Sequence, residues 1–251
     1  MIHPTALVSE KAKLGHNVTI GPYSIVHDAV VLEDEVTVEA YSEIGYPTPL
    51  AEGQPLIIGQ GALIRSHSVF YQGSRLGRGL VTGHRVMVRE NTVAGIGLHI
   101  GNQVDIQGDC RIGHYVHMHS HIQIGKKSEI GNFVWIFPDV LLTNDPNPPS
   151  SNLLGPIVED YAVIASKALL MPGVRVGRGA FVALQSLVNQ DVEPGVVVSG
   201  SPAKKICKAS DLRMKDKPVR AYPWLKRFHR GYPAEIVEQW LRGIDEVKFE
   251  D

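Results

Sequence analysis

The sequence predicts an all-β solenoid, a parallel β-helix with a small α-helical C-terminal extension. The main observation is an apolar residue at every sixth position over three runs, Ile2 to Ile44, Ile58 to Leu142 and Val158 to Val188. Thr82 and Ala94 are the small or polar exceptions among these positions. Neither the period of a helix nor the alternation of a strand repeats every six residues. A fixed repeat of this kind sets the architecture of the whole chain.

A six-residue repeat fits a short strand followed by a tight turn. Three such units, about eighteen residues, form one triangular coil, and stacked coils place each apolar residue inside a prism. One coil cannot bury its own inward face, so stability comes from stacked neighbours. Glycine follows many of the apolar residues, as at Gly21 and Gly101. We expect these glycines to relieve demanding backbone torsions at the corners.

The repeat is interrupted twice, at 45–57 and at 143–157, by segments rich in Pro, Gly, Asn and Ser. Clusters of these residues indicate loops that leave the column. We therefore predict a β-helix over residues 1–203 with two protruding loops. In a rigid solenoid, such loops are the expected functional elements.

The C-terminal extension, residues 204–251, has a different pattern. Apolar side chains over 233–247 recur with helical spacing, and Pro233 occupies the first turn of the predicted helix. We expect this helix to cap the open end of the prism or to pack on a neighbouring subunit. Its predicted apolar face consists of Ile236, Val237, Trp240, Leu241 and Ile244.

Charge and cysteine content narrow the functional classes. A formal net charge of −1 gives no reason to expect a nucleic-acid or membrane partner. Cys110 and Cys207 form no disulfide framework, and Cys110 falls in an inward position, where a core thiol is expected. Met1 to Pro4 enter the repeat directly, without a basic and apolar leader, which favours a cytoplasmic protein.

The richest polar cluster is the segment 110–122, and the phase of the repeat decides which of its histidines are accessible. With Met118 pointing inward, His117, His119 and His121 occupy outward positions. Three alternating outward histidines on one coil indicate that at least one is functional.

The same spacing predicts vertical neighbours on adjacent coils. His117 should stack between His99 and Trp135, and Asp139 should lie one coil from His121. A carboxylate there would hold one tautomer of His121 or raise the pKa of its imidazole.

Hexapeptide-repeat families include acyltransferases, zinc carbonic anhydrases and non-catalytic domains, and this chain resembles the acyltransferases. The resemblance implies a left-handed β-helix. The coil from His117 to His121 is similar to the catalytic coil of UDP-N-acetylglucosamine O-acyltransferase in lipid A synthesis. Other segments resemble bacterial nucleotide-sugar N-acetyltransferases, namely Ile44–Pro47, Ile64–Ser66, Thr82–His84, Val88–Asn91 and Thr143–Pro146.

This resemblance implies an acetyl transfer from acetyl-coenzyme A to the amino group of a nucleotide-linked amino sugar. The products would serve cell-surface glycans such as lipopolysaccharide or O-antigen. The alternative is O-acyl transfer to a UDP-sugar, as in lipid A synthesis. The shorter C-terminal region favours acetyl-coenzyme A over a long acyl chain on a carrier protein. The resemblance also implies a homotrimer with active sites between subunits.

The resemblance assigns roles to individual residues. His117 matches the general base of the lipid A enzyme by its phase, His119 is the alternative base, and Asn144 completes the expected catalytic set. A hydroxyl acceptor needs such a base, whereas a neutral amine already has a free lone pair. Asp145 is expected near the sugar or the pantetheine arm, and an Asx-turn that opens a Pro-rich loop is an equal alternative for Asn144 and Asp145.

Two further sets of residues are expected to bind the substrates. Contacts to the acceptor, including its phosphates, are expected from Arg65, His84, Arg89, His121, Asp139 and Asp145. Lysines can meet the phosphates of coenzyme A while backbone amides hold its pantetheine arm. The residues expected to contact coenzyme A are Trp135, Ala165, Lys167, Lys204 and Lys205.

Two rival functions predict different observations. Zinc carbonic anhydrases place three imidazoles around a metal. His114 and His119 have the spacing used in that family, but Arg78 stands where the third ligand belongs. No metal is therefore expected, and stoichiometric zinc would overturn this. A non-catalytic scaffold would bind no acetyl-coenzyme A.

Overall fold

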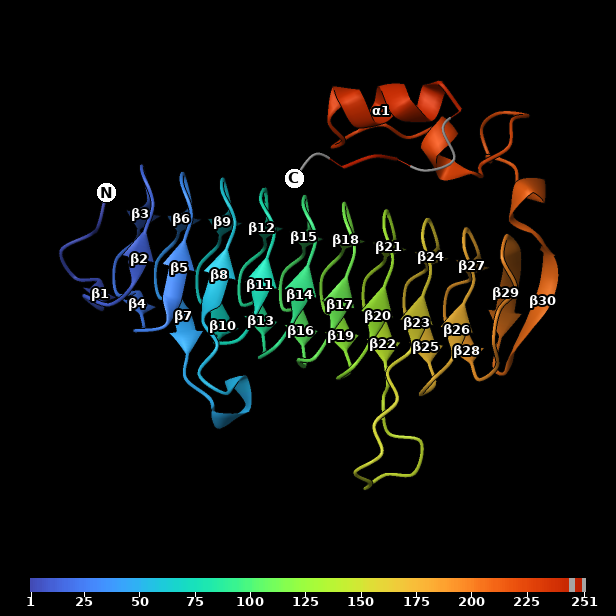
Figure 1. Ribbon diagram of the computed structural model, residues 1–251. Coiled ribbons are helices and arrows are strands. Elements are labelled where there is room, and N and C mark those ends of the chain that lie inside the picture. Colours follow the sequence, from blue (N-terminus) through green and yellow to red (C-terminus); the bar gives the residue numbers. More distant parts are fainter. Residues whose placement is uncertain (244–246, 250–251) are drawn as a thin grey trace.

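The protein is a three-sided column with a C-terminal segment folded against its outside (Figure 1). The computed structural model describes residues 1–243 and 247–249. Each coil of the chain adds one short strand to each of three sheets, and neighbouring strands in a sheet come from successive coils. The predicted fold class, a left-handed parallel β-helix with a small helical extension, is confirmed.

The strands are mostly two residues long, and we number the sheets by the first strand of each. Sheet 1 contains β1 (Leu7–Val8), β4 (Ile25–Val26), β7 (Glu43–Tyr46), β10 (Val69–Tyr71), β13 (Met87–Val88), β16 (Asp105–Ile106), β19 (Gln123–Ile124), β22 (Leu141–Leu142), β25 (Leu169–Leu170) and β28 (Leu187–Val188). Sheet 2 contains β2 (Lys13–Leu14), β5 (Val30–Leu32), β8 (Leu56–Ile58), β11 (Arg75–Leu76), β14 (Val93–Ala94), β17 (Arg111–Ile112), β20 (Glu129–Ile130), β23 (Ile157–Val158) and β26 (Arg175–Val176). Sheet 3 contains β3 (Thr19–Ile20), β6 (Thr37–Val38), β9 (Leu63–Ile64), β12 (Val81–Thr82), β15 (His99–Ile100), β18 (His117–Met118), β21 (Trp135–Ile136), β24 (Val163–Ile164), β27 (Phe181–Val182), β29 (Val196–Gly200) and β30 (Ala203–Lys208).

The inward residues form one continuous apolar core along the column. Thr82 and Ala94, the two small or polar residues in the six-residue repeat, do not shift the pairing of the strands. Ala94 pairs with Leu76 and Thr82 pairs with Ile100, one coil away in each case. The hydroxyl of Thr82 accepts a hydrogen bond from the backbone N–H of Arg65 at 2.9 Å. A buried hydroxyl that has a hydrogen-bond partner costs little stability. The strand pairing shows that no residue is inserted into the repeat between Leu76 and Ile100.

Stacking, and not backbone torsion, explains the glycine that follows many inward residues. Gly21 and Gly101 lie outside the left-handed region of φ, contrary to our expectation. A Cβ on Gly101 would lie 2.5 Å from the carbonyl carbon of His119 on the next coil. The left-handed torsions fall two residues later, as at Asn91 (φ 57°) and His121 (φ 60°). Asn and Asp tolerate this region better than most residues.

Both predicted loops are present, and they leave the column at the same corner, between sheets 1 and 2. The first connects β7 to β8 and contains the short helix η1 (Pro49–Ala51), and the second connects β22 to β23. In Figure 1 both point away from the side that carries the C-terminal segment. We call this edge of the column, over residues 71–74, 89–92, 107–110 and 125–128, the loop corner.

The end of the column differs from the predicted boundary at residue 203. Strand β30 pairs antiparallel with β29, so a hairpin completes sheet 3 and the column continues to Lys208. The extension then contains η2 (Ala209–Asp211), η3 (Trp224–Lys226) and α1 (Ala234–Leu241), with Pro233 at the N-cap of α1. Ile244 of the predicted helix lies outside the described residues.

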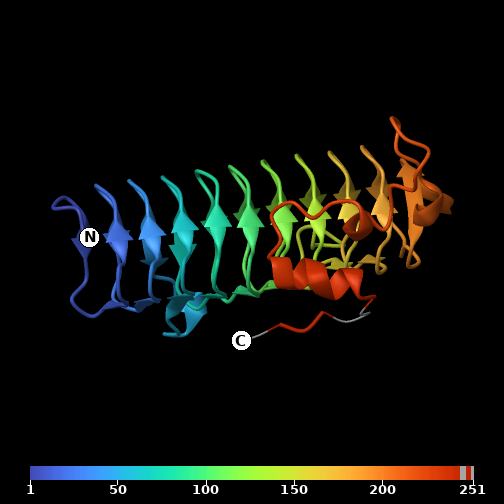
Figure 2. The same cartoon turned by 90° about the horizontal axis from the view of Figure 1, so that it is seen from above.

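The extension does not cap the prism. It runs back along the outside of the column, beside its middle coils (Figure 2). Within the predicted apolar face of α1, Ile236 and Trp240 are buried, but Leu241 is 69% exposed. No helix in the described part of the chain is long and apolar enough to span a membrane. The residues buried between extension and column are Phe133, Val163, Trp224, Tyr232, Ile236, Trp240 and Val247.

Candidate functional site

The structure separates the predicted site residues into distinct regions. The largest group lies on or beside the outer face of sheet 3, and a smaller group lies at the loop corner. Arg65, His84, His117, His119, Trp135 and Ala165 belong to the first group, and Arg89, Asn144 and Asp145 belong to the second. His121, Asp139 and Lys167 lie at the corner between sheets 3 and 1, and Lys204 and Lys205 lie on β30.

The stack on sheet 3 has the predicted vertical neighbours. The ring of His117 lies between those of His99 and Trp135, with centroids 4.6 Å and 4.2 Å away. The indole N–H of Trp135 donates a 2.7 Å hydrogen bond to the hydroxyl of Tyr232, which belongs to the extension. Tyr232 also packs edge-on against His117, with centroids 5.3 Å apart. The extension therefore covers Trp135 and His117.

This environment makes His117 a poor general base. Its Nε2 atom is buried and has no hydrogen-bond partner among the described residues. Burial, followed by the nearby His99 and His119, lowers the pKa of His117 to about 3. An efficient base has a pKa near the working pH. His117 therefore suits packing better than the proton transfer expected from the sequence.

His119 lies beside a shallow groove on sheet 3. Burial lowers the pKa of His119, and its ring stacks on Phe137 with centroids 4.7 Å apart. At the same face, the Arg65 guanidinium is 3.4 Å from the Glu39 carboxylate. His84 Nδ1 lies 2.9 Å from the Ser66 hydroxyl. The groove is lined by Arg65, His99, Asn102, His117, His119 and Trp135, among others.

The remaining predicted residues have few specific contacts. His121 and Asp139 are exposed on adjacent coils, and no hydrogen bond or ion pair joins their side chains within the described range. Lys205 pairs with Glu193 at 2.7 Å on an exposed surface. A cleft between the end of the column and the extension has basic and aromatic walls, including Lys205, Lys208, Lys226 and Trp224.

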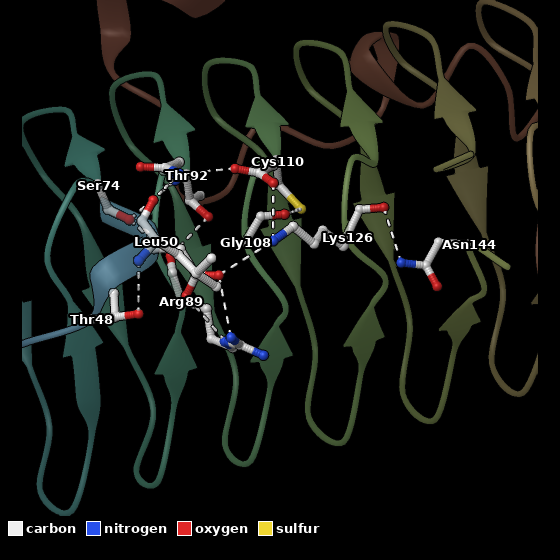
Figure 3. Close-up of polar contacts among 12 residues, drawn as sticks. Thr48, Leu50, Ser74, Arg89, Thr92, Gly108, Cys110, Lys126 and Asn144 are labelled. Carbon is white, nitrogen blue, oxygen red and sulfur yellow. Dashed lines mark hydrogen bonds and ion pairs between the residues drawn. The ribbon is translucent and has the colours of Figure 1, made fainter. Parts of the chain in front are cut away.

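The loop corner holds a network of ion pairs around a buried carboxylate (Figure 3). Glu90 is fully buried, and its two oxygens accept hydrogen bonds from Nε and Nη2 of Arg89, each at 3.2 Å. The ammonium of Lys126 lies 3.4 Å from Glu90 and 3.1 Å from Asp109. Charges buried in this way are stable only when paired. The network therefore fixes the positions of both cations.

The repeat explains how Glu90 and Lys126 meet across two coils. Gly108 occupies the intervening coil, and a Cβ there would lie 3.2 Å from Glu90 Oε1 and 2.8 Å from the Glu90 carbonyl oxygen. Because this coil presents no side chain, the Lys126 ammonium reaches Glu90. The carbonyl of Arg89 is held by the hydroxyls of Ser74 at 2.8 Å and Thr92 at 3.2 Å.

Both protruding loops are tied to this corner. Asn91 Nδ2 donates to the carbonyl oxygen of Leu50 in the first loop, at 3.0 Å. Asn144 Nδ2 donates to the carbonyl oxygen of Lys126 at 3.2 Å, at the start of the second loop. Asp145 accepts from the backbone N–H groups of Asn147 and Ser150, and the Ser150 hydroxyl bond lowers its pKa. Asp145 therefore forms the Asx-turn that we gave as the alternative.

Cys110 confirms its predicted structural role beneath the loop corner. The thiol is fully buried and donates to the Gly108 carbonyl at 3.1 Å. Burial raises its pKa to about 11. The thiolate is the nucleophilic form of cysteine, so Cys110 is an inert core residue.

Asp105, like Asp109 and Lys126, is a polar residue of this region that the sequence did not single out. It lies on β16, facing outward from sheet 1 beside the loop corner, and Gln107 Nε2 donates to its Oδ2 at 3.4 Å. Its other oxygen, Oδ1, is buried and has no partner within the described residues. Burial raises the pKa of Asp105, although Gln107 and the charge of Arg89 act in the opposite direction.

No protein-family model matches the chain. A 74-residue segment is 45% identical to 2,3,4,5-tetrahydropyridine-2,6-dicarboxylate N-acetyltransferase of Staphylococcus aureus, covering 30% of this chain and 30% of that enzyme. The chain therefore matches less than a third of the length of these curated relatives.

Solved structures extend the similarity to most of the chain. A UDP-N-acetylglucosamine acyltransferase from Arabidopsis superposes with a TM-score of 0.54 at 21% identity, over 83% of this chain and 74% of that one. The Bacteroides fragilis enzyme of the same name gives 0.51 at 18% identity, over 100% and 87%. This chain resembles hexapeptide-repeat acyltransferases. Among the described residues of this hexapeptide-repeat protein, no group of three or more His, Cys, Asp or Glu side chains is arranged to hold a metal ion.

Proposed function

We propose that this hexapeptide-repeat protein transfers an acetyl group from acetyl-coenzyme A to the amino group of a nucleotide-linked amino sugar. The observation that carries the proposal is the burial of His117, whose Nε2 atom has no hydrogen-bond partner among the described residues. The proposed acceptor site is the loop corner, where both protruding loops leave the column. Its cations, Arg89, Lys126 and Lys127, balance the carboxylates of Glu90, Asp109 and the adjacent Asp105, so the formal charge there is zero.

The low pKa of His117 favours an amine acceptor over a hydroxyl acceptor. A hydroxyl acceptor needs a base that removes its proton during attack, and a histidine with a pKa of about 3 is weak in that role. A neutral amine already has a lone pair, so positioning supplies most of the acceleration. The buried state of His117 therefore supports N-transfer over O-transfer.

The donor is proposed to lie along the later coils. Backbone amides near Ala165 would hold the pantetheine arm, and Lys167 and Lys204 are exposed partners for phosphate groups. Asn144 ties the second loop beside the reacting groups. A homotrimer, with a neighbouring column closing each site, is part of this proposal.

The test is a thiol-release assay with acetyl-coenzyme A against a panel of UDP- and dTDP-linked amino sugars. We expect turnover with at least one amine, and a product heavier than the acceptor by the mass of one acetyl group less one hydrogen atom. The matched control is the same nucleotide sugar with a hydroxyl in place of the amine. Turnover of the hydroxyl sugar alone would overturn the proposal.

O-acyl transfer to a UDP-sugar is the second candidate. It is favoured by the fold similarity to two UDP-N-acetylglucosamine acyltransferases and by His119, which lines an open groove. The deciding variant is His119→Ala. If O-transfer is the activity, this variant should lose turnover of UDP-N-acetylglucosamine, whereas N-transfer at the loop corner should continue at the wild-type rate.

Two measurements test the proposed trimer and the expected absence of a metal. Light scattering of the purified protein should give three times the chain mass of 27.5 kDa. Elemental analysis of the same sample should find no stoichiometric zinc. A monomer would require one column to form the whole site, and bound zinc would restore the carbonic anhydrase alternative.

A further inference from the structure

The outer face of sheet 1 is apolar along most of its length. In every strand, the residue directly before the inward position of the repeat points outward, so the sheets can be compared position by position. On sheet 2, five of the nine outward residues are charged, whereas on sheet 1 only Glu43 and Asp105 of the ten are. Seven of the other eight are apolar, from Leu7 on β1 to Leu187 on β28. We call these ten outward residues the sheet 1 strip.

The sheet 1 strip is accessible in the single chain. The extension covers another part of the column, because its partners, such as Phe133 and Val163, lie on sheet 3 or at its corner with sheet 2. Leu7 is 67% exposed, and none of the ten residues of the strip is buried. A large contiguous apolar surface of this kind marks an interaction site.

Two tyrosines widen the apolar surface at its N-terminal end. Tyr23 and Tyr41 lie at the corner between sheets 3 and 1, two residues before Ile25 and Glu43 of the strip. Their rings stack with centroids 5.2 Å apart, and both side chains are more than half exposed. Aromatic side chains are enriched at the interfaces between proteins.

The spacing and size of the strip indicate which partner fits it. It presents one side chain per coil, with coils about 4.8 Å apart. A second copy of the column has the same spacing, so each of its coils can contact the corresponding coil over the whole length. Ten strands span about 43 Å, and a face about 15 Å wide then covers roughly 650 Å². Each partner in a stable interface buries about 800 Å², so a contact along the whole column is large enough.

We propose that the sheet 1 strip is the surface on which a second copy of this chain packs, column beside column, and that this neighbour forms a wall of the acceptor site. The inference rests on the proposed function and names the surface that joins the subunits. Sheet 1 leads directly into the loop corner, because Tyr71 ends β10 and Arg89 follows β13. A column against sheet 1 therefore stands beside both protruding loops.

The test places charges on the strip in a double variant, Val69→Glu with Leu141→Glu. Light scattering should give the single-chain mass of 27.5 kDa at concentrations where wild type is assembled. The dissociation constant should rise by at least about 100-fold, because the interface would bury carboxylates without partners. Turnover of the amino sugar per chain should fall by at least about tenfold, since one wall of the site would be missing.

The matched control makes the same change on sheet 2, as Val31→Glu with Val93→Glu. Both residues are outward and aliphatic, like those of the strip, and Val93 is 44% exposed. This control should keep the assembled mass and the turnover of wild type.

A crosslinking measurement decides the matter if the double variant on sheet 1 does not fold. A photoreactive benzoylphenylalanine in place of Leu7 changes an exposed side chain, and irradiation should join two chains. The same probe in place of Val93 should join none. Absence of a crosslink at Leu7, or crosslinks of equal yield at both positions, would overturn the inference.

The outcomes separate this inference from the proposed function. If the folded double variant on sheet 1 keeps the assembled mass, the strip is not the interface, and acetyl transfer to an amine still stands. If the variant becomes a monomer with wild-type turnover, the neighbour forms no part of the site. If the strip proves to join the chains but wild type acetylates no amine, the proposed function fails and the interface stands.

Discussion

At the residue scale, the glycines and the corner residues of this column have different structural roles. The glycine directly after an inward residue gives room for the next coil, as the 2.5 Å approach at Gly101 shows. The residue two places later bends the chain through the left-handed region, and Asn, Asp, Tyr and His all occupy it here. Sequence periodicity locates both positions, but it does not distinguish crowding from torsion, because glycine satisfies either.

Two substitutions separate these causes. Gly101→Ala should lower the free energy of unfolding by about 1–3 kcal/mol, the usual cost of forcing an extra atom into a packed region. Gly61→Asn should cost less than about 0.5 kcal/mol. Gly61 has φ +68° with nothing within 4 Å of an added Cβ, and Asn91 already adopts φ 57° at the equivalent position. Denaturant titrations of both variants give the comparison, and equal losses would contradict it.

His117 makes stability depend on pH in a defined direction. Its pKa is about 3 in the folded chain and 6.5 in the reference state. Between these values the unfolded chain binds the proton more readily, so stability is full above about pH 6.5 and is lost as the pH falls toward 3. At pH 5 one such group costs about 2 kcal/mol.

The variant His117→Phe keeps an aromatic ring in the stack and removes this titration. Its loss of stability between pH 8 and pH 5, from denaturant midpoints, should therefore be smaller than that of wild type. His121→Asn, which removes an exposed histidine, serves as the control and should follow wild type. An identical pH dependence for His117→Phe and wild type would show that the ring is not buried in solution.

The loop-corner network shows which side-chain contacts the six-residue repeat predicts and which it does not. Counting back in coils from Asn144 gives Lys126, Gly108 and Glu90, so the repeat contains the signal for this network. The repeat does not say that Gly108 lets Lys126 reach Glu90, nor that Oδ1 of Asp105 lacks a donor. Both depend on side-chain conformations, which spacing does not determine.

At the element scale, the extension is the part of the molecule that the sequence predicted least well. A short amphipathic helix was expected, and α1 is present, but its partner is the aromatic surface of the column and not the open end. Trp135 and Tyr232 are 97 residues apart in the chain. A local pattern predicts that a helix has an apolar face, while the surface that covers it depends on contacts between distant segments.

Trp240 should hold the extension against the column. It contacts Phe133, Trp224 and Tyr232, with ring centroids between 4.8 Å and 5.6 Å. Trp240→Ala should cost about 3–5 kcal/mol of local stability, and limited proteolysis should then cleave after residue 208 while the column stays intact. The neighbouring Leu241→Ala changes a side chain that is 69% exposed and should resist the protease like wild type. Equal cleavage of the two variants would show that Trp240 does not anchor the extension.

At the scale of the whole molecule, the extension and the two protruding loops lie on different sides of the column. The extension covers the aromatic side, with His117 beneath it, while both loops leave from the loop corner (Figure 1). In a solenoid each coil contacts chiefly the coils before and after it along the column. The predicted site residues lie on both of these sides. The repeat predicts which residues point outward, but it does not predict which other segments cover them.

Replacing the second loop tests this division. The backbone N–H of Leu154 donates to the carbonyl of Asn144 at 2.7 Å, so the ends of the loop already meet and a four-residue Gly-Ser linker can replace 145–153. The hydrogen bonds of Asp145 stay within the loop. The variant should therefore unfold within about 1 kcal/mol of wild type, but it should lose at least about tenfold in kcat/KM, since loops on rigid scaffolds carry function.

Trp240→Ala is the opposite control for the loop variant. It should unfold more easily, yet at a temperature where the column is folded it should retain wild-type turnover, because the two loops and the extension lie on opposite sides of the column in Figure 1. The reverse result, an active loop variant and an inactive Trp240→Ala, would place the chemistry under the extension. His117 and His119 would then regain the catalytic roles that the resemblance to the lipid A enzyme first suggested.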